Sequence, residues 1–223
     1  KMNLEIENLE QFYAQSSTFN ENLEKQTFVY LYTAKLNKHF LEGTFTEGLE
    51  LIKPIETKLG QYHQYIDIHR VLVFYYKIAS LYFGSGDNEQ AIEYLNKIIN
   101  LKVGHLRSDI QCFARLLHLI AHYELDNLQL VEHLIKSVYR FLSKMESLDA
   151  VLTQIFEFLK KSLSSNPQDV KKSFVELRNK LEIISTSKYN RRSYHYLDIV
   201  SWLDSKIENI AVEEVIRRKF MKG

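Results

Sequence analysis

The stretch that decides the fold is residues 72–101, LVFYYKIASLYFGSGDNEQAIEYLNKIINL. On both sides of a central turn, apolar residues recur every three or four positions, which is the spacing of one face of an α-helix. The turn contains Gly84 and Gly86, and glycine adopts positive φ angles without steric cost. The stretch therefore predicts two amphipathic helices, and so short a connection makes them antiparallel.

Six positions of this stretch combine aromatic, large apolar and small side chains at fixed spacing: Tyr75, Ile78, Ala79, Tyr82, Ala91 and Leu95. The pattern resembles the tetratricopeptide repeat, a helix pair of about 34 residues. The small residues Ala79 and Ala91 would let the two helices approach closely where they cross. Two positions depart from the family pattern, because Ile98 stands where the family usually has Ala and Val103 stands about where it has Pro.

Weaker copies of the pattern occupy residues 27–57 and 112–142. The turn centres of the three units are Gly43, Gly86 and Asp126, so the spacings are 43 and 40 residues, more than in the standard repeat. We therefore expect longer helices or looser links than in regular members of the family. The resemblance implies an all-α fold, a right-handed superhelix of antiparallel helix pairs that ends in C-terminal capping helices.

The composition agrees with a helical chain. Of 223 residues, 45% are hydrophobic and 26% are charged, and only 7 Gly and 2 Pro interrupt the helical pattern. We expect one repeat domain over residues 1–223, with tetratricopeptide-like repeats in 1–144 and a divergent helix pair and cap in 145–223. Since the first residue is Lys1 and not Met, we expect the chain to be a fragment of a longer protein.

Charge and hydropathy narrow the classes of partner. The formal net charge is +1, so no strong field favours nucleic acid, although residues 1–50 carry a net −4 and residues 151–223 a net +5. No apolar run is long enough to cross a membrane, and the first ten residues do not form a signal peptide. The single Cys112 lies on an apolar helical face, which predicts a core residue and a reducing, cytoplasmic location.

The remaining periodicity predicts the other helices, with Pro54 as a kink in one of them. The expected ranges are 4–19, 21–41, 46–59, 62–83, 89–101, 108–125, 128–144, 148–163 and 168–184, with one or two helices over 193–220. Trp202 shares an apolar face with its helical neighbours in the last range. We expect this Trp, the only one in the chain, to be buried under the cap.

Two histidine arrangements have the spacing of possible chemical sites. His118 and His122 have a spacing that can hold a metal ion, but Leu119 stands where a zinc protease motif has its general base, so packing is the preferred interpretation. His63 and His69 flank Asp67, yet no recognised motif supplies a nucleophile, so an exposed helix start is preferred.

Two other motifs are explained by structure and do not require a ligand. Gly84-Ser85-Gly86 lacks the lysine ending of a phosphate-binding loop and is explained by the repeat turn. Basic residues near the C-terminus are interleaved with tyrosines, as in some nucleic-acid sites, but neighbouring acidic residues favour a solvated end of mixed charge. These basic residues are Lys188, Arg191, Arg192, Arg217, Arg218, Lys219 and Lys222. No catalytic residue, metal or cofactor is predicted.

The resemblance also implies where a partner binds. In tetratricopeptide proteins the first helix of each pair lines a concave groove that takes extended peptides or helices. The matched positions here are Tyr30, Thr33, Asn37, Phe40, Val73, Tyr76, Ser80, Phe83, Phe113, Leu116, Ile120 and Tyr123. They form an apolar, aromatic groove without the Lys/Arg/Asn clamp of members that grip a C-terminal carboxylate. The occupant stays open between an external partner and the chain itself, for example residues 4–13.

The sequence therefore predicts a non-catalytic scaffold module that binds a protein or a peptide, with nucleic acid an unlikely partner. A peptide-sensing regulatory domain of a larger protein is the first alternative. An enzyme domain whose site lies elsewhere in the full chain is the second.

Overall fold

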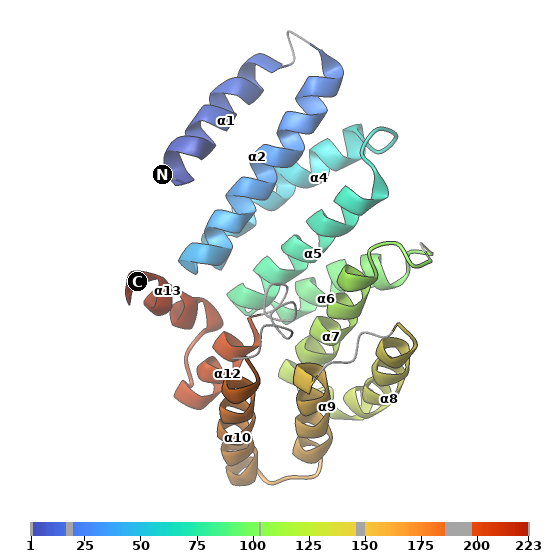
Figure 1. Cartoon of the computed structure of the whole chain (residues 1–223), viewed down its shortest axis with the longest axis vertical. Coiled ribbons are helices and arrows are strands. Elements are labelled where there is room, and N and C mark those ends of the chain that lie inside the picture. Colours follow the sequence, from blue (N-terminus) through green and yellow to red (C-terminus); the bar gives the residue numbers. More distant parts are fainter. Residues whose placement is uncertain (1, 17–19, 103, 146–149, 186–197, 223) are drawn as a thin grey trace.

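The computed structural model of the chain describes residues 2–16, 20–102, 104–145, 150–185 and 198–222 (Figure 1). Within these ranges the regular structure is helical throughout, and consecutive helices pack on one another. The helices are α1 (Met2–Ser16), α2 (Glu21–Glu42), α3 (Phe45–Gly48), η1 (Leu49–Leu51), α4 (Ile52–Gln61), α5 (Ile68–Ser85), α6 (Asn88–Ile99), α7 (Ser108–Glu124), α8 (Leu128–Lys144), α9 (Ala150–Ser162), α10 (Pro167–Ser185), α12 (Ile199–Glu208) and α13 (Val212–Lys222). The expected all-α solenoid is confirmed.

The central pair α5 and α6 begins and ends on capping residues. The side chain of Asp67 accepts a hydrogen bond from the backbone N–H of Arg70 and so caps the start of α5. Gly86 has a φ of 93° and ends α5 in the left-handed conformation that glycine allows. Asp87 follows at once and caps α6 by accepting from the N–H of Gln90. Gly86 and Asp87 therefore fix a tight turn between two antiparallel helices.

Ala79 and Ala91 are both fully buried, and α5 packs closely on α6. Replacing Ala91 by Leu is expected to overpack this contact and to lower the free energy of unfolding by about 1–3 kcal/mol. Urea denaturation followed by circular dichroism measures the change. Glu93→Leu, at an exposed position of the same helix, is the matched control and should leave stability almost unchanged. Equal stability of the two variants would contradict the packing of Ala91 at the crossing.

Two predicted helices differ in extent from those observed. The helix expected over 46–59 is divided into α3, η1 and α4, because Pro54 has no N–H to donate to the preceding turn and 3-10 geometry replaces α-helix at Leu49–Leu51. The helix expected from Tyr62 begins only at Ile68, since the cap at Asp67 sets its first turn. The last expected range contains two helices, separated by Asn209 at a φ of 56°.

The C-terminal third turns back toward the beginning of the chain. The pair α9 and α10 is followed by α12, which packs against α10, and α13 then packs against α2 and α5 (Figure 1). The Glu213 carboxylate accepts from the N–H and the hydroxyl of Thr46, both at 3.0 Å. We expected a cap over the last repeat. α12 lies there, but α13 instead closes on the turn between α2 and α3.

The expected burial of two residues is confirmed. Trp202 is 1% exposed, and Cys112 is buried as part of the core and forms no disulfide. Among the described helices, none combines the length and hydropathy needed to cross a membrane.

Candidate partner-binding site

A pocket of about 590 Å³ opens between α2, α5, α7 and α13. Its walls are mostly apolar: Phe40, Leu41 and Phe45 on one side, Val73, Tyr76 and Phe83 on α5, Ile110 and Leu117 on α7, and Val212 and Ile216 on α13. Its polar and charged lining residues are Asn37, Lys77, Ser80, Arg107 and Asp198. The volume lies in the range of ligand pockets, which are typically apolar with a few polar groups.

The structure brings six of the predicted groove residues together in this pocket: Asn37, Phe40, Val73, Tyr76, Ser80 and Phe83. Asn37 is exposed, and Phe40 and Val73 are half-buried, so all three can meet a ligand. Tyr76 and Phe83 expose only 5% and 7% of their surface and belong to the hydrophobic core. Replacing these two residues would therefore disturb folding as well as binding.

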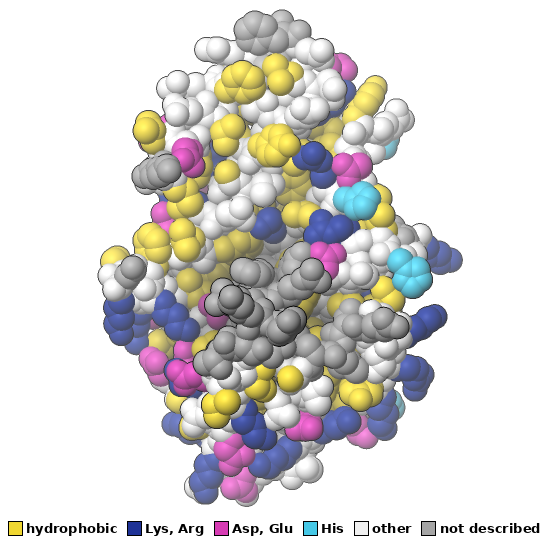
Figure 2. All heavy atoms as spheres, viewed as in Figure 1, with side chains coloured by type: hydrophobic (Ala, Val, Ile, Leu, Met, Phe, Trp, Pro, Cys, Tyr) yellow, Lys and Arg dark blue, Asp and Glu magenta, His cyan; other side chains and the backbone are white. Residues whose placement is uncertain are grey.

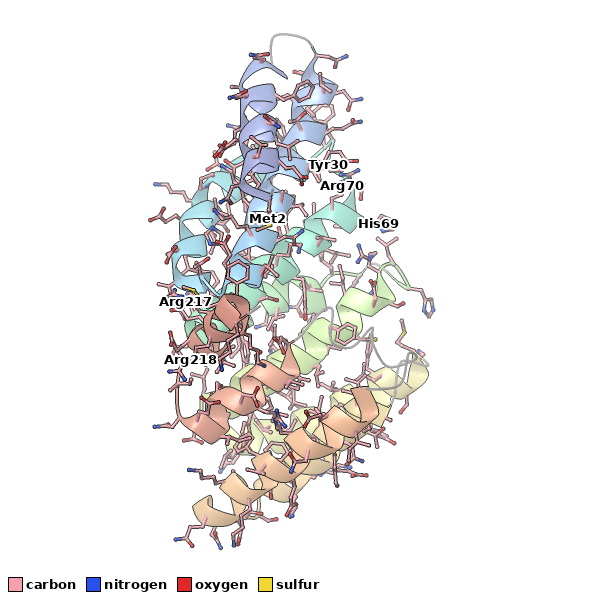
Figure 3. The ribbon with its side chains drawn as sticks, turned by 60° about the vertical axis from the view of Figure 1, so that its left-hand side comes forward. Met2, Tyr30, His69, Arg70, Arg217 and Arg218 are labelled. Carbon is pink, nitrogen blue, oxygen red and sulfur yellow. The ribbon has the colours of Figure 1, made fainter. Side chains whose placement is uncertain are left out.

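Tyr30 lies outside the pocket, on the same side of α2 toward its N-terminal end. Its ring is 58% exposed, and the guanidinium carbon of Arg70 lies 5.6 Å from the ring centroid. Figure 3 shows the two side chains next to each other, on α2 and at the start of α5. Such a contact between a cation and an aromatic face holds both side chains in place at the rim of the groove.

The predicted stripe does not continue onto the third repeat. Phe113, Leu116 and Ile120 are buried in the core, and Leu116 is only 1% exposed. Tyr123 is half-buried, with ring centroids of Phe158 and Trp202 at 6.1 and 6.5 Å. The expectation of an open groove is wrong at Phe113, Leu116 and Ile120, which are core residues. At Tyr123, rings of the C-terminal helices pack on the end of α7.

Lys77 was not among the predicted groove residues, yet it lines the pocket from the middle of α5. Its ammonium nitrogen donates to Oδ1 of Asn37 at 2.6 Å and lies 5.1 Å from the centroid of the Phe40 ring. Burial lowers the pKa of Lys77 to about 8. One feature of the sequence could have pointed to Lys77 as a functional residue, since it is the only charged residue between positions 71 and 86. The contributions of Arg107, Asp198 and α13 had no such signal, because they reach the pocket only through the fold.

α1 does not fill the groove. It packs along α2, where Ile6 is buried and Glu10 pairs with Lys35 (Figure 1). No residue of α1 lines the pocket. Of the described segments, α13 is the one from the end of the chain that closes a wall, with Val212 and Ile216.

His118 and His122 lie in contact on α7, with their ring centroids 4.5 Å apart. Burial, with smaller effects of His122 and Arg115, lowers the pKa of His118 to about 4, so the ring is neutral at pH 7. Glu124 faces elsewhere, because it accepts hydrogen bonds from Trp202 and Lys206. In the described ranges, no third His, Cys, Asp or Glu completes a metal-binding group here.

The other motifs have structural roles. Asp67 caps α5, while His63 and His69 are exposed. A Cβ added to Gly84 would lie 2.6 Å from the Phe45 ring, so this glycine serves close packing and does not require a phosphate ligand.

The basic C-terminal residues divide into two groups. Lys188, Arg191 and Arg192 lie outside the described residues. On α13, Arg218 pairs with Glu208 and Glu214, and Lys219 pairs with Asp204. Figure 2 shows charges of both signs mixed over the lower part of this face, and hydrophobic side chains gathered over α1 and α2.

Comparison with known proteins identifies one segment. Residues 72–102, which span α5 and α6, match the family model of the tetratricopeptide repeat. No curated protein and no solved structure matches the chain.

Proposed function

We propose that this chain, whose central helix pair is a tetratricopeptide repeat, is a non-catalytic module that holds a segment of a partner protein against α2 and α5. The pocket between α2, α5, α7 and α13 takes one large apolar side chain of that segment as an anchor. Tetratricopeptide repeats serve in general as protein-interaction scaffolds, and the matched residues 72–102 supply one full wall of the pocket.

The observation that carries the proposal is the apolar hollow at the matched groove positions. Phe40 and Val73 face it while only half-buried, and Leu41 at its rim is 55% exposed. A concave apolar site on a surface that otherwise carries charges of both signs is typical of an interaction site. In such a site, one or two buried side chains dominate the binding energy. α13 narrows the pocket, which favours a side chain or a short segment over a long helix.

Substitutions at two pocket residues test this function: Leu41, which is exposed, and Val73, which is half-buried against the core. The probe is a library of short random peptides displayed on phage, from which binders are selected on the wild-type protein and synthesised. We expect Leu41→Asp and Val73→Asp to weaken the selected peptides about tenfold or more, because each replaces apolar contact surface with a carboxylate that loses water when an apolar anchor binds. At position 73 the new carboxylate also lies one helical turn from Lys77 and can pair with it. Fluorescence anisotropy measures the affinities.

Leu130→Asp is the matched control, since Leu130 is a similarly exposed leucine on α8 and does not line the pocket. It should bind every selected peptide as the wild type does, and all three variants should keep the wild-type circular dichroism spectrum. Peptides that bind the pocket variants and the wild type equally would contradict the proposed site.

A further inference from the structure

Lys77 is a charged residue of the pocket for which no opposite charge is found among the described residues. Lys77 projects from the middle of α5 into a wall formed by Phe40 and Val73. Its hydrogen bond to Oδ1 of Asn37, at 2.6 Å, is to a neutral amide. Within the described ranges no carboxylate forms an ion pair with Lys77. An ammonium group has three donors, so one hydrogen bond leaves donors available to a ligand.

The other charged residues that line the pocket are already engaged. Arg107 binds both carboxylate oxygens of Asp109, at 3.0 and 2.9 Å. Asp198 caps α12 by accepting from the N–H of Ser201 at 2.9 Å. The lowered pKa of Lys77, about 8, agrees with an ammonium that has lost water without gaining a counter-charge.

Lys77 is half-buried, so its ammonium has lost part of its water. An opposite charge with good hydrogen-bond geometry would compensate for this loss. A carboxylate brought by the ligand would accept a charge-assisted hydrogen bond from Lys77, which is stronger than a bond between neutral groups. The apolar wall around it would receive the neighbouring side chain. The site therefore fits an acidic group directly beside an apolar one.

We propose that the partner segment held in this pocket carries an Asp or Glu side chain next to its apolar anchor, and that Lys77 pairs with this carboxylate. The inference rests on the proposed function, since it names the chemistry of the segment that the pocket takes. Lys77 thereby sets specificity, while the apolar wall supplies most of the contact surface.

The test uses the same phage library, with peptides displayed at the N-terminus of the coat protein so that none has a free C-terminal carboxylate. Selection on the wild-type protein is expected to enrich Asp or Glu beside a large apolar residue. Selection on Lys77→Met, which keeps the length of the side chain without its charge, should lose the acidic preference. Lys77→Arg, which keeps the charge, should retain it.

A double-mutant cycle then isolates the pair. Exchanging the selected acidic residue of a synthetic peptide for its amide should weaken binding to the wild type about tenfold or more, and should leave binding to Lys77→Met unchanged. Because both peptides are compared on the same protein in each arm, an effect of Lys77→Met on folding alone would change the two affinities equally and would cancel in the cycle.

These outcomes distinguish the role of Lys77 from the proposed function of the pocket. Peptides that need Leu41 and Val73 but show no acidic preference would overturn the role of Lys77 and leave the proposed function standing. The same holds for an acidic preference that Lys77→Met retains. Peptides that are insensitive to Leu41→Asp and Val73→Asp would overturn both.

Discussion

Replacing Trp202 by Ala is expected to lower the free energy of unfolding by about 3–5 kcal/mol, the usual cost of removing a buried aromatic side chain. The Trp202 ring is 1% exposed and lies at the centre of a cluster, with ring centroids of Phe174, Phe158 and Tyr123 at 5.6, 6.4 and 6.5 Å. These rings come from α7, α9, α10 and α12. The cavity left by Ala would therefore loosen four helices at once.

The polar edge of Trp202 adds to this cost. Its indole N–H donates to Oε1 of Glu124 at 2.7 Å, while Lys206 donates to Oε2 of the same carboxylate at 2.7 Å. Without the indole, Glu124 loses one of its two partners in a partly buried place, and an unsatisfied polar group is costly. The hydrogen bond joins α12 to the end of α7, so it also fixes where the C-terminal helices dock.

Urea denaturation followed by circular dichroism measures the loss, because Trp202→Ala removes the only Trp of the chain. Trp202→Phe is the matched control: it keeps most of the apolar contact and removes the N–H, so it should cost clearly less than Ala. Since repeats in a solenoid stabilise one another mainly through neighbours, hydrogen exchange should rise first in α9, α10 and α12. A loss below about 1 kcal/mol would contradict the central place of this ring.

Gly43→Ala is expected to cost about 2–4 kcal/mol and to release α13 from α2. Gly43 ends α2 at a φ of 65°, where any other L-residue is strained. In addition, a Cβ at this position would lie 2.6 Å from the backbone oxygen of Glu213 and even closer to the backbone nitrogen of Arg217. Backbone atoms of α13 cannot rotate away as a side chain can, so the whole helix must shift.

Gly86→Ala is the matched control. Gly86 has a similar left-handed conformation, with a φ of 93°, but an added Cβ meets no atom within 4 Å. It should cost only the conformational strain, about 1–2 kcal/mol. Hydrogen exchange of the α13 amides distinguishes the two variants, since only Gly43→Ala should accelerate it. Equal exchange of α13 in both variants would show that the close approach at Gly43 does not hold the helix.

The sequence by itself determined the helix pair at the centre of the chain. The caps at Asp67 and Asp87, the glycine between them and the small residues Ala79 and Ala91 are local features, each readable within a few positions. Residues 72–102, which match the tetratricopeptide repeat, contain Ala79, Gly86, Asp87 and Ala91. Helical periodicity also located α8 over Leu128–Lys144 and predicted that Trp202 is buried.

Helical periodicity was less reliable where a single residue favours a break in the helix that its neighbours predict. The periodicity of residues 46–59 is helical, but the missing N–H of Pro54 divided the helix. At residues 62–67, apolar spacing alone predicted a helix, and the capping side chain of Asp67 decided against it. In one place a missing backbone N–H, and in the other a side-chain cap, outweighed the hydrophobic pattern.

Only the tertiary structure decided the shape of the groove. Matched repeat positions predicted an open stripe over three units, but Leu116 and Ile120 are covered in the core. In the other direction, Val212 and Ile216 of α13 became a wall of the pocket far from the repeat that they face. Lys77 likewise became a pocket residue only through the fold. Helical periodicity shows which face of a helix is apolar. Which other segment covers that face depends on contacts between residues more than a hundred positions apart. Those contacts exist only in the folded chain.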